Sequence, residues 1–76
     1  DASHFKAAFQ LGHVYRKQGQ LHDALNWYFV ANDINSQSPE LLECIAEIYD
    51  EIGDESLADD YRKLASRHRR NKRRKG

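Results

Sequence analysis

The histidines and the cysteine are the side chains most able to support catalysis or metal binding, and their spacing favours neither. His4, His13 and His22 are nine residues apart, which places them on separate helices or turns. His22 and Asp23 are neighbours, and adjacent helical residues do not face each other, so they form no catalytic dyad. Cys44 is the only cysteine, which excludes a multi-cysteine zinc site and is typical of a reducing compartment. We therefore expect no metal, no cofactor and no enzymatic activity.

The charged side chains divide between two parts of the chain. Residues 1–61 contain 12 acidic and 3 basic side chains, whereas residues 62–76 contain 9 basic side chains and no acidic one. The formal net charge of zero therefore hides an acidic body and a basic end. Seven cations of this end are candidates for contact with an anionic partner: Arg67, Arg69, Arg70, Lys72, Arg73, Arg74 and Lys75.

Three interpretations of this basic end are open. It could be a nucleic-acid or nuclear-import patch, a contact with an anionic membrane surface, or a helix extension whose cations fold back on the acidic body. No Trp, Tyr or Phe lies among these cations, so a nucleic acid would be contacted through its phosphates and not by base stacking. Such binding should weaken steeply with added salt.

The spacing of apolar residues predicts four helices and no strand. The predicted helices cover about 4–17, 21–33 and 39–52, and the fourth begins after Asp54. Leu11 and Val14 of the first helix and Leu57 of the fourth belong to the apolar stripes expected to point inward. Gly19 and Gly53 supply the permissive backbone that ends the first and third helices. Ser38 followed by Pro39 is a restart signal, with a hydroxyl N-cap before a proline at the first helical position.

The most specific pattern in the chain is a repeat offset by 34 residues. Periods of 20 to 50 residues indicate stacked helical repeats, and small residues at matched positions let antiparallel helices approach closely. Tyr15, Tyr28 and Tyr49 are placed to fill the space beside those small residues. The aligned pairs are Leu11 with Ile45, Gly12 with Ala46, Val14 with Ile48, Tyr15 with Tyr49, Gly19 with Gly53, Ala24 with Ala58, and Ala31 with Ala65.

These residues resemble the tetratricopeptide repeat (TPR) family. The first copy carries Leu11, Gly12, Tyr15, Gly19, Ala24, Tyr28 and Ala31, and the second carries Leu42, Ile45, Ala46, Tyr49, Gly53, Ala58 and Ala65. The chain departs from the family pattern at Ala8, at Ser36 where a proline is common, and at Arg62 where the first copy has Tyr28. A charged residue at position 62 is typical of a terminal repeat with a polar outer face.

The resemblance implies an all-α fold of two antiparallel helical hairpins stacked as a short right-handed solenoid. The expected organisation is a leader at 1–4, a first repeat at 5–38, a terminal second repeat at 39–70 and a basic tail at 71–76. We expect the pair to be the C-terminal end of a longer array. Two repeats are fewer than the roughly three that a stable array usually needs, so we expect neighbouring repeats or self-association.

The resemblance also places a partner-binding groove on the first helix of each repeat. Its expected lining is Lys6, Phe9, His13, Arg16 and Lys17 from the first repeat, and Glu43, Glu47 and Asp50 with their neighbours Glu40 and Glu51 from the second. The alternative is that these charges pair with neighbouring helices and are otherwise solvated. Trp27 and Phe29 lie outside the core pattern of their helix. They either pack under the next repeat or contact a further repeat, a partner or a second copy.

The combined expectation is a protein-binding scaffold or adaptor that recognises a peptide or a partner helix. The Lys and Asn clamp of some TPR domains for a C-terminal carboxylate is absent, because Phe9, His13 and Cys44 occupy the matching positions. The alternative function is nucleic-acid or nuclear-import contact through the basic tail. No apolar stretch approaches the roughly 20 residues of a membrane span. The expected location is the cytoplasm, with the nucleus as the alternative.

Overall fold

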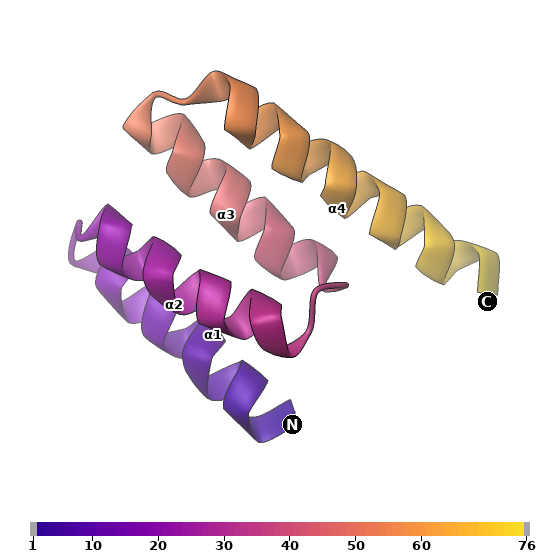
Figure 1. Ribbon diagram of the computed structural model, residues 1–76, viewed down its shortest axis with the longest axis horizontal. Helices are drawn as coiled ribbons and strands as arrows, with labels where there is room; N and C mark the ends of the chain where they lie inside the picture. The colour runs from indigo at the N-terminus through magenta and orange to yellow at the C-terminus, as the bar shows by residue number, and fades with distance from the viewer. Residues whose placement is uncertain (1, 76) are drawn as a thin grey trace. The chain divides into compact units, whose positions relative to one another are not determined.

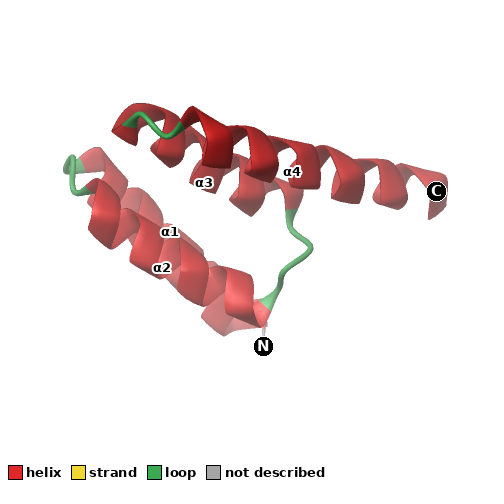
Figure 2. Ribbon diagram, turned by 45° about the horizontal axis from the view of Figure 1, so that its top comes forward, coloured by secondary structure: helices red, strands yellow, loops and turns green. Residues whose placement is uncertain are grey.

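The structure is a computed structural model that describes the backbone of residues 2–75 and the side chains of residues 3–70. Within these residues it consists of helices joined by short turns, with no strand (Figures 1 and 2). Its helices are α1 (Ala2–Lys17), α2 (Leu21–Ile34), α3 (Pro39–Ile52) and α4 (Glu55–Lys75). α1 packs against α2 and α3 packs against α4. The resulting hairpin 1 (α1 and α2) and hairpin 2 (α3 and α4) are separate compact units, the first ending at Ser36 and the second beginning at Gln37. The predicted all-α arrangement of two hairpins is confirmed.

The helix ends follow the capping chemistry of the sequence. Ser38 Oγ accepts a hydrogen bond from the Leu41 N–H at 3.3 Å, and Pro39 occupies the first turn of α3. Gly53 ends α3 with φ +102°, a left-handed conformation that glycine adopts without steric penalty. Asp54 Oδ1 accepts from the Leu57 N–H at 3.2 Å and caps α4. The predicted breaks on both sides of α3 are therefore present.

The structure places two helix ends that the sequence left approximate. Residues 2–4, expected to be a leader, are the first residues of α1. α4 continues to Lys75, so the backbone of residues 71–75, named above as a basic tail, is helical, in agreement with the helix-extension interpretation. Arg and Lys are good helix formers, and cations near a helix C-terminus interact favourably with its dipole. These two effects explain a helix that continues past its last apolar side chain.

In hairpin 1, the two helices pack through a large aromatic ring that contacts a glycine. Tyr28 of α2 is fully buried, and a Cβ added at Gly12 of α1 would lie 2.3 Å from Tyr28 Cε1. The prediction that a small residue makes room for an aromatic is thus confirmed at this crossing. The face of α1 that meets α2 carries Gly12 and Ala8, so Leu11 and Val14, expected to point inward, are 37% and 48% exposed. The rest of the hairpin 1 core is Ala8, Ala24, Leu25 and Ala31.

Hairpin 2 has the larger aliphatic core. The Tyr49 and Tyr61 rings stack between α3 and α4 with centroids 5.7 Å apart. Arg62 occupies the position that matches Tyr28 and is exposed, and Ala46 occupies the position that matches Gly12. Because no ring enters at this crossing, an alanine fits. The buried residues are Leu41, Leu42, Ile45, Ala46 and Ile48 of α3 and Ala58 and Ala65 of α4; Leu57, expected to be inward, is 38% exposed.

Candidate partner-binding site

A row of rings lies along one face of α1. Phe5, Phe9 and His13 are four residues apart, which aligns them on the helix surface. The Phe5 and Phe9 rings meet edge to face at 5.6 Å, and Phe9 stacks on His13 at 4.8 Å. Tyr28 of α2 meets the edge of both Phe9 and His13, at 5.7 Å and 5.5 Å. We call Phe5, Phe9, His13 and Tyr28 the aromatic row.

The Tyr28 hydroxyl holds His13 in a defined orientation. Tyr28 Oη and His13 Nδ1 are 2.7 Å apart and share a hydrogen bond, in which the phenol donates when the imidazole carries its proton on Nε2. Desolvation by burial lowers the pKa of His13 below 6.5, and the charges of Arg16 and Lys17 lower it further. His13 is therefore mainly neutral at pH 7, the charge state in which Nδ1 is able to accept a hydrogen bond. The bond satisfies the polar end of a side chain whose ring is fully buried.

All the charged side chains of α1, which carries three rings of the aromatic row, are cations apart from its histidines. α1 contains Lys6, Arg16 and Lys17 and no acidic residue. Lys6 and Lys17 are exposed, and Arg16 is half-buried. Phe9 is also half-buried, so part of its ring meets solvent while the rest is supported by neighbouring rings. The surface can therefore offer an apolar ring and positive charge to the same ligand.

The acidic residues of α3 have partners within hairpin 2. Arg69 forms a bidentate pair with Glu43, with Nη1 to Oε2 at 2.5 Å and Nη2 to Oε1 at 3.3 Å, and its Nη2 lies 4.0 Å from Glu40 Oε2. Arg62 donates to Asp50. Each hydrogen bond to a carboxylate raises the pKa of its arginine. Glu43 and Asp50 are thus engaged by α4 cations.

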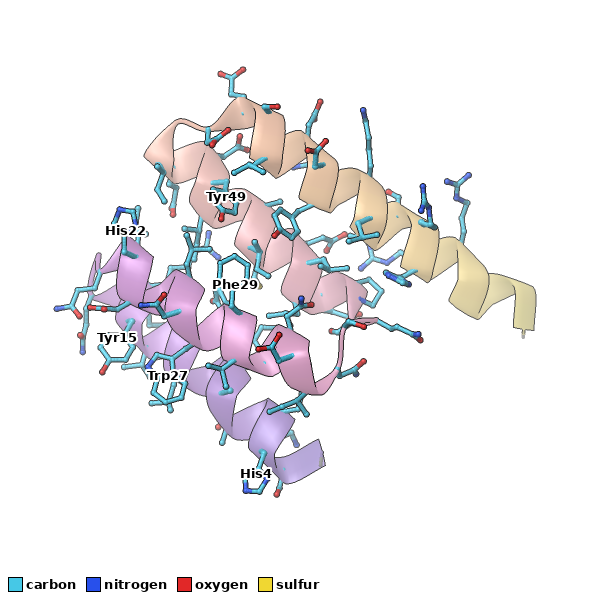
Figure 3. All side chains as sticks on the ribbon, in the orientation of Figure 1. His4, Tyr15, His22, Trp27, Phe29 and Tyr49 are labelled. Carbon is cyan, nitrogen blue, oxygen red and sulfur yellow. The ribbon has the colours of Figure 1, made fainter. Side chains whose placement is uncertain are left out.

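The remaining predicted residues are dispersed. Trp27 and Phe29 are both half-buried, but they extend from opposite sides of α2 and do not form one surface (Figure 3). Glu47 is exposed on α3, and Arg67 and Arg70 are exposed on α4. The side chains of Lys72, Arg73, Arg74 and Lys75 lie outside the described residues.

Phe5 and Tyr28 belong to the aromatic row although sequence reasoning assigned neither to the site. The available signal was the four-residue spacing of Phe5, Phe9 and His13, which places three rings on one face. No such signal links Tyr28 to His13, since their contact depends on how α2 crosses α1. The pairs of Arg62 with Asp50 and of Arg69 with Glu43 likewise depend on how α4 lies on α3.

Other site chemistries find no support among the described residues. In this part of the chain, no three His, Cys, Asp or Glu side chains gather as metal ligands would. Of the described helices, none combines the length and apolar character that crossing a bilayer requires. Comparison with known proteins matches the sequence to no family model and to no curated protein.

Proposed function

We propose that this chain is a TPR-type binding module without catalytic activity, and that the aromatic row of hairpin 1 is its partner-binding surface. One observation carries the proposal: Phe9 is partly exposed yet held by Phe5, His13 and the buried Tyr28. A ring that is already ordered loses little conformational entropy when a ligand covers it. Large aromatics in such positions commonly supply a disproportionate share of binding energy.

The partner we propose is a peptide or helix that carries an apolar side chain beside carboxylates. The apolar group would pack on Phe9, and the carboxylates would meet Lys6, three residues before Phe9, and Arg16 and Lys17, three and four residues after His13. Charges at the rim act mainly on the rate of association and on selectivity. The pairing of Glu43 and Asp50 within hairpin 2 favours hairpin 1 as the main surface.

The proposed role is that of a TPR-type adaptor in the cytoplasm or nucleus. Exposed apolar side chains of hairpin 1 are the basis for proposing contact with neighbouring repeats or a second copy. Leu11 and Val14 of α1 are 37% and 48% exposed, and Val30 and Ile34 of α2 are 44% and 39% exposed. Large apolar side chains that stay exposed mark an interaction site where they form a contiguous patch.

A peptide selection tests the aromatic row directly. A random peptide library is selected on the immobilised chain, and the best ligands are measured by fluorescence anisotropy against wild type, Phe9→Ala and Ala7→Ser. We expect ligands that combine carboxylates with an apolar residue. Phe9→Ala removes the proposed anchor and should weaken binding by about 10-fold or more. Ala7 is exposed and lies two residues before Phe9, on the other side of α1, so Ala7→Ser should leave the affinity unchanged.

Two outcomes would refute the proposal. One is that no peptide is enriched on the chain over the bare support. The other is that the selected peptides bind Phe9→Ala and wild type equally well while circular dichroism shows both to be folded. A third arm, Lys6→Gln with Lys17→Gln, checks the charge argument, because it should reduce the dependence of binding on salt.

A further inference from the structure

The cations of α4 fall into two sets that the sequence does not distinguish. Arg62 and Arg69 pair with Asp50 and Glu43 of α3. Lys63, Arg67 and Arg70 lie elsewhere on the helix surface and make no ion pair with any described side chain. The first set neutralises hairpin 2 internally, and the second set leaves its positive charge available to a ligand.

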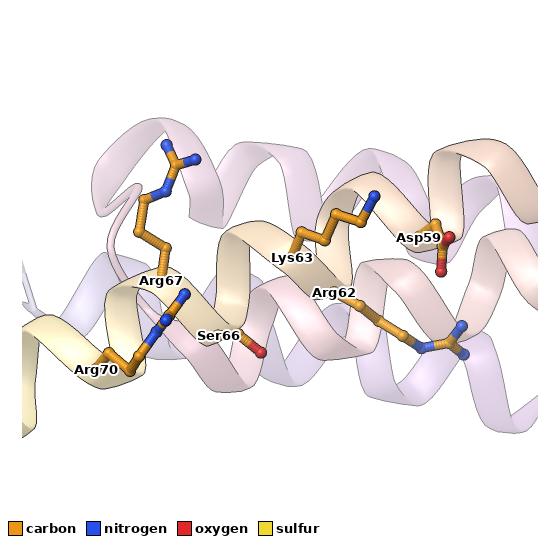
Figure 4. A pocket seen from close by; sticks show the side chains of 6 residues that line it. All are labelled: Asp59, Arg62, Lys63, Ser66, Arg67 and Arg70. Atoms are coloured by element: carbon orange, nitrogen blue, oxygen red, sulfur yellow. The ribbon is translucent and has the colours of Figure 1, made fainter.

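Lys63, Arg67 and Arg70 line a shallow hollow of about 370 Å³ on the surface of α4. Figure 4 shows Lys63 and Arg67 extending from the same side of the helix, with Ser66 between them along the chain. Asp59 and Arg62 complete the hollow at its N-terminal end. We call Lys63, Ser66, Arg67 and Arg70 the outer basic strip. At 1.5 Å per residue, the strip spans about 10 Å of helix.

The chemistry of the strip suits phosphates better than a protein surface. Protein interfaces depend on apolar anchors in a desolvated centre, and the strip contains none. No Trp, Tyr or Phe follows Tyr61, so the strip offers no platform for unstacked bases. Arginine guanidinium groups and a serine hydroxyl are common donors to phosphate oxygens. The strip is also comparable in length to about three successive nucleotide steps of a duplex strand, each of which rises by about 3.4 Å along the axis.

We infer that the outer basic strip of α4 binds the phosphodiester backbone of double-stranded nucleic acid without reading its sequence. Lys63, Arg67 and Arg70 contact phosphate oxygens, and the Ser66 hydroxyl donates to one of them. The helical backbone of α4 continues to Lys75. The four further basic residues of that segment add to the attraction. This activity is independent of peptide binding on hairpin 1.

The test compares two double variants that remove the same charge from the same helix. The outer variant is Lys63→Gln with Arg67→Gln, and the inner variant is Arg62→Gln with Arg69→Gln. Binding of the full chain to a fluorescent DNA duplex of about 20 base pairs is followed by anisotropy from about 50 to 200 mM NaCl. Two duplexes of unrelated sequence are used, and circular dichroism checks that α4 is intact in both variants.

We expect the outer variant to weaken binding by about 10-fold or more near 100 mM NaCl. It should also reduce the slope of log K against log salt by about 1.8, since each lost phosphate contact contributes about 0.9. The inner variant should change Kd by less than about 3-fold, because its two arginines are already paired with carboxylates. The two duplex sequences should bind equally.

Four results would overturn the inference. The first is that the chain does not bind the duplex at about 50 mM NaCl, and the second is that the two variants weaken duplex binding equally. The third is that polyglutamate of equal total charge displaces the duplex, and the fourth is that the chain binds phosphatidylserine vesicles more tightly than the duplex. The last two would assign the strip to an acidic protein or to a membrane surface. None of the four bears on the peptide selection, which reports on hairpin 1.

Discussion

Replacing Gly12 by alanine should destabilise hairpin 1, although alanine is normally the better helix former. The added Cβ would lie 2.3 Å, 2.4 Å and 3.0 Å from Cε1, Cδ1 and Cζ of Tyr28. The Tyr28 ring cannot move aside easily, because it is fully buried, meets Phe9 and His13 at its edges, and is bonded to His13. Either the ring or the crossing of α1 and α2 must shift.

The magnitude follows from two opposing effects. A glycine-to-alanine change inside a helix stabilises it by about 0.5–1 kcal/mol. Overpacking a well-filled core costs about 1–3 kcal/mol, and three contacts at or below 3.0 Å place Gly12→Ala in the upper half of that range. The net prediction is a loss of about 1–2 kcal/mol in the free energy of unfolding of hairpin 1.

Urea unfolding followed by fluorescence measures this loss. Trp27 is the only tryptophan and lies in α2, so its emission reports on hairpin 1. Ala7→Gly at an exposed position of α1 calibrates the intrinsic preference of the helix for alanine. The double variant Gly12→Ala with Tyr28→Leu should lose much less than the sum of its two single changes, because the smaller side chain removes the clash.

One result would refute the reasoning about this crossing. If Gly12→Ala raised the free energy of unfolding by about the amount that Ala7→Gly lowers it, position 12 would behave as an open helical site. The Tyr28 ring could then not be packed against the glycine. An additive double variant would lead to the same conclusion, because two residues in contact are expected to couple.

Three further predictions concern charge and association. Because the pKa of His13 in the folded chain lies below 6.5, hairpin 1 should keep its full stability above about pH 6.5 and lose some as the pH falls through that folded-state pKa. Trp27 fluorescence in urea at several pH values checks this, and His13→Gln should flatten the dependence of stability on pH. Arg69→Ala and Glu43→Ala should show a small favourable coupling in a double-mutant cycle that disappears in high salt, since both side chains are more than 40% exposed. Sedimentation velocity should detect self-association of the wild-type chain that Leu11→Lys with Val30→Lys abolishes, and a wild-type chain that stays monomeric at high concentration would contradict that surface assignment.

Much of the fold could be predicted because its signals are local. Ser38 and Pro39 define the start of α3, and Gly53 with its positive φ ends it. The pairing of Gly12 with a large ring was also foreseeable, since close helix contacts need a small residue on one side. The exposure of Leu11 was not foreseeable from the apolar pattern. Its aligned partner Ile45 is fully buried, and equal positions in a repeat can meet different surroundings.

The sequence by itself determined the four helices, the two ends of α3, the repeat and the separation of an acidic body from a basic end, because each depends on residue type and spacing along the chain. The tertiary structure decided which side chains share a surface. Only the crossing of α1 and α2 joins Tyr28 to Phe9 and His13, and only the contact of α3 with α4 pairs Arg69 with Glu43. A contact between helices depends on their relative rotation and depth of packing, and no spacing within one helix encodes either quantity. For the same reason, the distinction between the paired arginines of α4 and its outer basic strip emerged only from the structure.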